Sequence, residues 1–381
     1  MTRRTVALVE RRTRAVKLPR AEVDFLLGHA RNVIEVSPTY EPRVYRLTAR
    51  GHVGFIDGPG ARYAIAPKIP WPNLRMLLGL APDPAETAEP TGGLLGALAV
   101  AFADRLEDVV RGGLVAGYGE TETVTTFLRG KLRTADQMRD VAARAFPDRF
   151  HVNEPSFDLH TPWNRVPRAA ASALLRRGGL SEAIRRRVEA AAAPLAPVPD
   201  VPATDADFVA ALAEPRAASY RPLLEVCRLV LNGLNAANPL GTDSGAFLVD
   251  LGRAFERYLT AALGRALAER TGWAVDEQPR FSLGETDLQP DIVVRVNGAP
   301  RVVLDAKWKT ANPEASDLHQ ILAYATLTGS EHVGLVYPGL KYGRGHLTTP
   351  DGRVRVSIFR LRVIGSEAKL ARSVWRLARS L

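Results

Sequence analysis

Residues 289–308 read QPDIVVRVNGAPRVVLDAKW, and this stretch decides the fold of the C-terminal part of the chain. Its two arms, Pro290 to Val296 and Pro300 to Trp308, are rich in Val, Ile and Leu, as β-strands are. Asn297 and Gly298 lie between the arms, and this dipeptide favours a tight turn. The stretch therefore predicts a β-hairpin.

Three charged side chains of this hairpin are predicted to converge. Side chains alternate faces along a strand, so Asp305 and Lys307 project to the same face. With a loop from Asn297 to Pro300, Asp291 on the first arm falls opposite about position 306 of the second. Two carboxylates and one ammonium group then share one place on the sheet.

This arrangement suits a metal-dependent hydrolase. Facing carboxylates repel unless a positive charge lies between them, and a hard divalent cation such as Mg²⁺ or Mn²⁺ prefers their oxygens. Such a cation polarises a phosphoryl oxygen and activates bound water, and Lys307 can orient that water or offset developing charge. The alternative is an ordinary ion pair of Asp305 and Lys307 at a strand edge, which the apolar context VVLDAKW disfavours. The pattern predicts phosphodiester hydrolysis.

The motif Pro290-Asp291 followed by Asp305-Ala306-Lys307 resembles that of the PD-(D/E)xK nuclease superfamily. The resemblance implies that the two aspartates hold the metal ion and that the carbonyl of Ala306 adds a ligand. It also implies that the lysine positions the attacking water. The implied activity is Mg²⁺-dependent DNA cleavage by an endonuclease.

Two predicted helices flank the hairpin. Phe247 to Arg270 has the apolar stripe of an amphipathic helix, with Glu256 at its margin. In a helix over Asp317 to Thr328, Gln320 and Tyr324 are four residues apart and share a face. The resemblance implies that Glu256 assists as a metal ligand or base, and that Gln320 and Tyr324 support the lysine or the scissile phosphate. A solvated Glu256, and plain packing and capping roles for the other two, are the alternatives.

Composition indicates a basic globular protein with a polyanionic partner. The chain has 381 residues, and 51 Lys and Arg against 41 Asp and Glu give a net charge of +10. This charge suits DNA, although a membrane surface or the ribosome would also attract it. There is no run of about 18 apolar residues, and the N-terminus lacks the apolar core of a signal peptide. The single cysteine, Cys227, excludes an intramolecular disulfide and suits a reducing compartment, so we expect a cytoplasmic protein.

A longer series of segments resembles the McrC family, the nuclease subunits of McrBC-type modification-dependent restriction systems. The segments are GHVGFID (51–57), RYAIAPKIP (62–70), NLRMLLGLA (73–81), RGGLVAGYGETETVTTFLRGKL (111–132), FHVNEPSFDLHTPWNRVPRAAASALL (150–175), FLVDLGRAFERYL (247–259), the hairpin and HQILAYA (319–325). The chain departs from the family where residues 130–133 lack an expected acid and where residues 251–253 replace a methionine-bearing stretch.

The family resemblance implies a role in phage defence with a separate motor. The implied partner is a McrB-like, ring-forming AAA+ GTPase that recognises methylated DNA and is stimulated by the nuclease subunit. The chain has no G-x-x-x-x-G-K-[ST] phosphate loop, so we expect it to bind no nucleotide itself. The alternatives are a stand-alone repair or replication nuclease and a non-catalytic DNA-binding regulator of an NTPase. The intact Asp291, Asp305 and Lys307 favour the enzyme.

The predicted fold class is mixed α/β with two domains. We expect a β-rich N-terminal domain over residues 1–165 that docks on the NTPase partner. We expect a restriction-endonuclease-like domain over residues 166–381, with a central mixed sheet flanked by helices. The Pro-rich residues 194–202 predict an extended, exposed spacer, and Pro82 to Pro90 and Tyr342 to His346 predict loops.

Residues from Val166 to Arg187 predict a pair of basic helices. They contain five arginines, Arg176, Arg177, Arg185, Arg186 and Arg187. A nucleic-acid-binding patch and a solvated arginine-rich helix face both fit this pattern.

Overall fold

The computed structural model describes residues 4–80, 93–140, 148–176, 179–236, 245–283, 286–309 and 312–381. Contacts divide the chain into two compact units: Met1–Pro90 with Asn235–Leu381, and Thr91–Leu234. The single boundary that we expected near residue 165 instead falls inside α6 (Pro162–Arg176) of the second unit. The second unit is therefore inserted into the first. Local composition does not reveal this, because only contacts between residues far apart in the sequence show that the chain returns to its first unit. The loop expected at Pro82 to Pro90 and the residues around Gly178 lie outside the described part of the chain.

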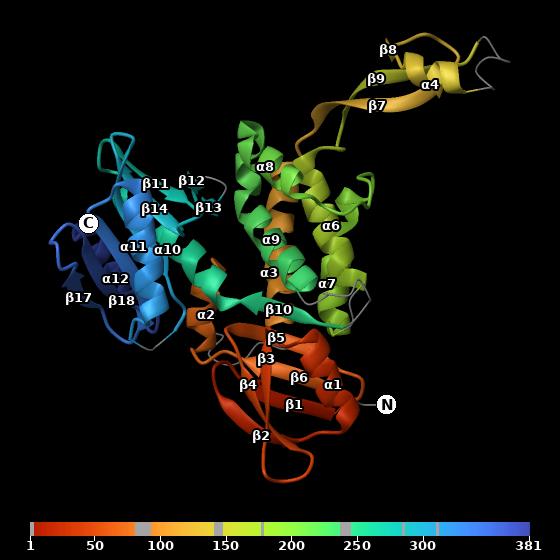
Figure 1. Ribbon diagram of the computed structural model, residues 1–381. Coiled ribbons are helices and arrows are strands. Elements are labelled where there is room, and N and C mark those ends of the chain that lie inside the picture. Colours follow the sequence, from red (N-terminus) through yellow and green to blue (C-terminus); the bar gives the residue numbers. More distant parts are fainter. Residues whose placement is uncertain are drawn as a thin grey trace. The chain divides into compact units, whose positions relative to one another are not determined.

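The N-terminal part of the first unit contains two small sheets around one core (Figure 1). Its elements are β1 (Arg4–Val9), β2 (Thr13–Lys17), α1 (Arg20–His29), β3 (Ile34–Pro38), β4 (Val44–Ala49), β5 (His52–Asp57), β6 (Ala61–Ala66) and α2 (Trp71–Leu77). The strand orders are β1-β6-β5-β10 and β2-β4-β3, and α1 packs on β3. This part is β-rich, as the sequence predicts.

Strand β10 (Phe247–Asp250) joins the two parts of the first unit, because it pairs with β5 in the N-terminal sheet. We had predicted a helix from Phe247, but α10 runs from Leu251 to Leu267. The side chain of Asp250 accepts hydrogen bonds from the backbone N–H groups of Gly252 and Arg253, and so caps the helix. The apolar residues before this cap are buried by strand pairing, which periodicity alone did not distinguish from a helix.

The C-terminal part of the first unit contains a six-stranded mixed sheet. Its remaining elements are β11 (Trp273–Glu277), β12 (Phe281–Leu283), β13 (Thr286–Leu288), β14 (Ile292–Val296), β15 (Ala299–Ala306), α11 (Ala315–Thr328), β16 (His332–Gly339), β17 (Gly343–Thr348), β18 (Arg355–Arg362) and α12 (Glu367–Arg379). The strand order is β11-β14-β15-β16-β18-β17, in which β15, β16 and β18 are parallel. Helix α11 packs on β15 and β16, α12 packs on β18, and α10 packs on α12. This sheet with its flanking helices confirms the predicted fold class.

The hairpin is tighter than we predicted. Asn297 and Gly298 alone form the turn, with φ of 50° and 84°, and Val296 pairs with Ala299. Between Arg295 and Val294 the register shifts by one residue. The cause is a β-bulge, in which Pro300 and Arg301 of the second strand together lie opposite Arg295.

The bulge decides which side chains meet. A two-residue turn without it would place Asp291 opposite Leu304, on the other face from Asp305. With the bulge, Ile292 pairs with Leu304, and the same register places Asp291 opposite Asp305. The extra residue therefore brings the two carboxyl groups to one face.

Two expected irregular segments are ordered differently. Tyr342 to His346 does not form a loop throughout, because β17 pairs antiparallel with β18 at the edge of the sheet. In the Pro-rich stretch, residues 193–195 form the 3-10 helix η1, and Leu195 and Val198 are buried. The stretch is therefore not a fully exposed spacer, because Leu195 and Val198 are buried, although Val201 is exposed.

The second unit is mainly helical. Its elements are α3 (Gly93–Gly112), β7 (Gly117–Thr125), β8 (Lys131–Leu132), α4 (Thr134–Arg139), β9 (Phe150–Asp158), α6, α7 (Glu182–Ala192), η1, α8 (Asp205–Ala213), η2 (Pro215–Tyr220) and α9 (Arg221–Ala236). Strands β7, β9 and β8 form a separate sheet, seen in yellow in Figure 1. No helix in the described part of the chain is both long enough and apolar enough to cross a membrane.

Candidate active site

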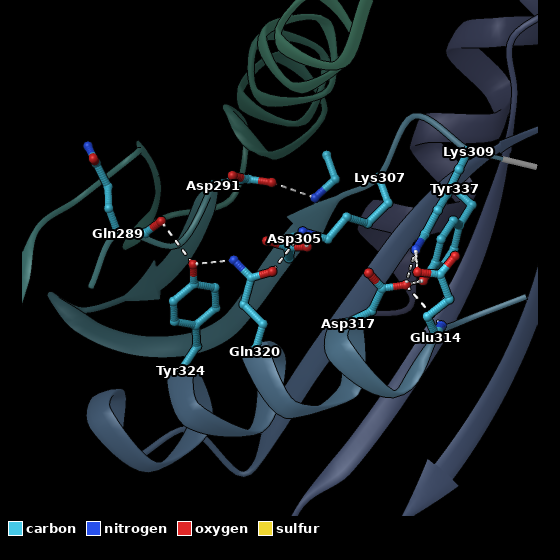
Figure 2. A network of polar contacts seen from close by, with 11 residues as sticks. Gln289, Asp291, Asp305, Lys307, Lys309, Glu314, Asp317, Gln320, Tyr324 and Tyr337 are labelled. Atoms are coloured by element: carbon cyan, nitrogen blue, oxygen red, sulfur yellow. Dashed lines mark hydrogen bonds and ion pairs between the residues drawn. The ribbon is translucent and has the colours of Figure 1, made fainter. Parts of the chain in front are cut away.

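The two aspartates and the lysine of the hairpin lie together at the ends of β14 and β15 (Figure 2). Asp305 is almost fully buried, at 1% exposure. Its Oδ2 lies 2.7 Å from Nζ of Lys307. The backbone N–H of Ala306 donates to Oδ2 of Asp291 over 2.7 Å, which orients that carboxyl group. Burial of Asp305 excludes a solvated strand-edge ion pair.

Helix α11 supplies a hydrogen-bonded chain that holds the lysine. Nζ of Lys307 donates to Oε1 of Gln320 over 2.8 Å, and Nε2 of Gln320 donates to Oη of Tyr324 over 2.8 Å. The hydroxyl of Tyr324 in turn donates to the carbonyl of Gln289 over 3.2 Å. This series of hydrogen bonds begins at Lys307 and ends at Gln289, and both residues belong to the hairpin segment. Gln320 and Tyr324 therefore connect α11 to the predicted site (Figure 2).

Glu256 on α10 is buried, at 8% exposure, and its Oε1 accepts a hydrogen bond of 2.5 Å from Nε2 of Gln278. Burial raises the pKa of Glu256, and the negative charge of Asp305 adds to this effect. The charge of Glu256 also acts on Asp291. The alternative of a solvated Glu256 is therefore wrong. Gln278, which the sequence analysis did not single out, has no local motif that would have marked it.

The three carboxyl groups are short of positive charge. Burial first, and then the charges of Asp305 and Glu256, raise the pKa of Asp291 to about 8. Burial also raises the pKa of Asp305, against the lowering effect of Lys307. Burial opposes the charged form of Lys307, but the neighbouring carboxylates keep its pKa above the usual value. One ammonium group thus faces the two aspartates, and Arg253 acts to lower the pKa of Glu256.

This donor set fits a hard divalent cation. Oδ1 of Asp305 is buried, and no donor group of the described residues reaches it. Such an oxygen is costly to bury unless something positive binds there. Across the described ranges no group of three His, Cys, Asp or Glu side chains forms a ready metal cage. Mg²⁺ commonly binds through one or two carboxylates with waters and substrate phosphates, so Asp291 and Asp305 suffice.

A second acid–lysine pair, absent from our predictions, lies beside the first. Nζ of Lys309 lies 2.7 Å from Oδ2 of Asp317 and 3.0 Å from Oε2 of Glu314. Oη of Tyr337 donates to the same Oδ2 of Asp317 over 2.9 Å. Glu314 and Asp317 also form the capping box of α11, and an acid three residues after the helix cap is a signal that the sequence carries. The pair anchors the start of α11 to the residues after β15.

The residue after the lysine connects the site to the N-terminal sheets. Nε1 of Trp308 donates to Oε1 of Glu10 over 3.0 Å, and Glu10 is fully buried. The ring of Trp308 also packs on Phe255 of α10 with centroids 5.4 Å apart. Burial raises the pKa of Glu10, while Lys68 and Arg11 act to lower it. This contact spans almost the whole sequence, so no local pattern predicted it.

Comparisons with known proteins identify the family of the chain and a similar fold. The family described as McrBC 5-methylcytosine restriction system component matches residues 47–338, which include every predicted site residue. A chain of the refined half-complex from a tetradecameric assembly of Thermococcus gammatolerans McrB AAA+ hexamers with bound McrC is similar in fold. Its TM-score is 0.55 and its identity 19%, over 99% of this chain and 100% of that one.

A chain of the cryo-EM structure of the Thermococcus gammatolerans McrBC complex matches with a TM-score of 0.43 and 21% identity, over 70% of this chain and 88% of that one. No curated protein sequence gives a significant match. The family match covers well over half of the chain. The chain belongs to the family of McrBC 5-methylcytosine restriction system components.

Proposed function

We propose that the chain is the metal-dependent DNA endonuclease subunit of a modification-dependent restriction system. The observation that carries this proposal is the convergence of Asp291, Asp305 and Lys307, with a buried oxygen of Asp305 that no donor reaches. A purely structural site would not leave buried carboxyl groups with so little compensating charge. Membership of the restriction-system family supports DNA as the proposed substrate.

Asp291, Asp305, the carbonyl of Ala306 and Glu256 are the groups that would hold Mg²⁺ or Mn²⁺. When bound, the metal supplies Lewis-acid activation of the phosphate and a lowered pKa of water. Lys307 orients the attacking water and offsets negative charge on the phosphate. Glu256, with its raised pKa, is suited to accept the proton that the water loses as its oxygen bonds to phosphorus. The bond from phosphorus to the leaving sugar oxygen then breaks, and that oxygen takes a proton from solvent water.

Gln320 and Tyr324 act on the lysine rather than on the substrate. The amide oxygen of Gln320 accepts a hydrogen bond from Lys307, and Asp305 is the second acceptor. Together the two acceptors fix the orientation of the ammonium group. Tyr324 holds the amide in that orientation. This support leaves the third N–H of the ammonium group to contact water or a phosphate oxygen.

The proposed partner is a McrB-like AAA+ GTPase ring that reads the modified DNA. In the Thermococcus gammatolerans assembly McrC is bound to McrB AAA+ hexamers. The sequence lacks a phosphate loop of its own, which fits this division of labour. Such a system acts on DNA in the cytoplasm.

The sheet β7-β9-β8 offers a surface that suits such a partner. Large apolar side chains are exposed along it and its connections, namely Tyr118, Val124, Phe127, Leu128, Met138 and Phe157. Exposed apolar groups on a sheet and its connections favour a protein interface. The predicted partner-docking role of residues 1–165 includes this sheet.

The test is cleavage of methylated and unmethylated plasmid with Mg²⁺, by the chain alone and with the AAA+ protein encoded beside it, plus GTP or ATP. We expect cutting only of methylated plasmid in the complete mixture, and none with Asp305→Asn. Cutting by the chain alone would instead favour a stand-alone nuclease. Stimulation of the partner's NTPase without any cutting would leave a regulator and refute the proposed activity.

A further inference from the structure

Helix α12 carries basic side chains along its solvent face. Four cations lie on this face, and they are defined here as the α12 stripe: Lys369, Arg372, Arg376 and Arg379. All four are exposed, whereas Leu370, Val374 and Leu377 face the core. At 100° per residue the four cations fall within an arc of about 80°. They therefore point in one direction.

The charges of the α12 stripe are not neutralised. Within the described ranges none of its four side chains forms an ion pair with an acid. Instead, the guanidinium group of Arg379 lies 4.9 Å from the ring of Trp375, and that of Arg376 lies 6.0 Å from Tyr342. Ring contacts hold an arginine without cancelling its charge. Trp375 is itself 50% exposed.

The basic helices singled out from the sequence behave differently. Arg186 pairs with Glu182 at 2.8 Å, Arg185 with Glu189 at 3.5 Å and Arg176 with Asp200 at 3.3 Å. Arg187 pairs with both Asp104 and Glu107 of α3. These arginines form ion pairs with acids of the same protein, and this argues against a nucleic-acid-binding patch there. They provide a comparison for the α12 stripe, because their charges are neutralised.

The dimensions of the α12 stripe match a DNA backbone. Ten residues of helix separate its first and last cations, a rise of about 15 Å. A DNA duplex carries one negative charge about every 1.7 Å of helix axis, so several phosphates lie alongside this rise. The four cations, which have no acidic partner among the described residues, thus extend along a length of duplex with ample negative charge.

We propose that the α12 stripe binds the phosphate backbone of duplex DNA outside the cleavage site. This inference rests on the proposed function, because it assumes that DNA is the substrate. Contacts from lysine and arginine to phosphate oxygens carry no sequence information, so a stripe that binds the backbone holds DNA of any sequence. Such binding suits a subunit whose partner selects the modified site, because the nuclease itself then needs only to hold the backbone.

The test compares two variants of equal charge. The stripe variant is K369Q/R372Q/R376Q/R379Q, and the control variant is R176Q/R185Q/R186Q/R187Q, so each lowers the net charge from +10 to +6. Binding of a short unmodified duplex is followed by fluorescence anisotropy without divalent metal, over about 50 to 200 mM salt. Circular dichroism checks that both variants are folded. A charge-retaining variant, R372K/R376K/R379K, is measured in parallel.

We expect the slope of log K against log salt to fall by about 3 to 4 in the stripe variant, at about 0.9 for each lost contact. The control variant and the charge-retaining variant should keep the wild-type slope. If the full stripe variant does not fold, R376Q alone should lower the slope by about 0.9. An unchanged slope in the stripe variant, or an equal loss in the control, would overturn the proposal.

Failure of the stripe and failure of the nuclease assignment give different results. Wild-type cleavage together with an unchanged slope in the stripe variant would reject only the DNA-binding role of α12. If that variant instead changes the sedimentation of the protein and not its DNA binding, the face is a protein interface and the proposal is wrong. Absence of wild-type cleavage in the complete plasmid assay would reject the proposed function.

Discussion

Two acid–lysine pairs lie between the end of β15 and the start of α11, and their carboxyl groups have opposite electrostatic character. In each pair a carboxyl oxygen lies 2.7 Å from the ammonium nitrogen. One pair is Asp305 with Lys307, and the other is Asp317 with Lys309. Asp317 also accepts from Tyr337 and from the backbone of Glu314, and despite burial these partners lower its pKa. The pKa of Asp305 is raised. Equal distances therefore do not imply equal roles.

The difference follows from the number of partners around each carboxyl group. Asp317 is surrounded by donors, so its charge is already compensated and the pair is structural. Asp305 shares one lysine with Asp291, and one of its oxygens has no donor. A carboxyl group in that condition is suited to bind a cation. In the network of Figure 2, Asp305 and Lys307 thus belong to the proposed metal site, and Asp317 and Lys309 form the pair that anchors the start of α11.

The largest expected effect comes from removing the charge of Asp305, with Asp317 as the comparison. Asp305→Asn should lower cleavage by at least about 100-fold, because it removes a predicted metal ligand. Asp317→Asn should retain most of the cleavage rate but lower the free energy of unfolding by about 1–3 kcal/mol, because donors lose their acceptor charge. Cleavage assays and urea unfolding of both variants distinguish the pairs. Equal loss of cleavage in the two variants would erase the distinction.

The lysine of the site should depend on its amide support. Gln320→Leu removes the acceptor that orients Lys307, and we expect about tenfold slower cleavage at saturating metal. The rate constant should fall while the concentration of DNA giving half the maximal rate stays unchanged, if Gln320 acts through Lys307 as proposed. Gln320→Glu, which keeps an acceptor at the same place, serves as the matched variant and should be less impaired. A change confined to DNA affinity would place Gln320 at the substrate instead.

Stability should depend on pH with opposite sign at the two sites. The pKa of Asp291 is raised to about 8, so its folded state binds a proton more tightly than the unfolded state does. Its stabilising contribution is complete below about pH 4 and is lost as pH rises through 8. Asp317, with a lowered pKa, stabilises the fold above its unfolded pKa and loses that contribution in acid.

Melting temperatures of the metal-free protein between about pH 5 and pH 9 test this prediction. Asp291→Asn should abolish much of the wild-type decline toward alkaline pH, since an amide does not titrate. Addition of Mg²⁺ at pH 8 should stabilise the wild type and not the variant, because the metal binds the deprotonated carboxyl group. A wild-type protein that gains stability from pH 5 to 9 without metal would contradict the raised pKa.

The smallest effect concerns Glu10, another buried acid. Trp308→Phe removes the indole N–H that donates to Glu10 but retains an aromatic ring beside Phe255. We expect the free energy of unfolding to fall by about 1–3 kcal/mol, because a buried acceptor loses its partner. Cleavage per folded molecule should change less than in the Gln320 variant. Urea unfolding at equal pH measures the effect, and full stability of the variant would show that Lys68 and Arg11 suffice for Glu10.

By itself the sequence determined the hairpin, its Asn297-Gly298 turn, and the residue types that a metal-dependent nuclease needs. Those features depend on side-chain periodicity and turn chemistry, which neighbouring residues encode. Even the family resemblance was visible in short segments and their order. The helix carrying Gln320 and Tyr324 was also predictable, because an apolar period and a capping acid define it.

Only the tertiary structure decided the bulge that aligns Asp291 with Asp305, the insertion of the second unit, and the contact of Trp308 with Glu10. It also decided that the arginines near α7 are neutralised while those of α12 are not. The physical reason is the same in each case. Burial and charge compensation are set by groups far away in the chain, and a local pattern contains no information about which distant group will arrive.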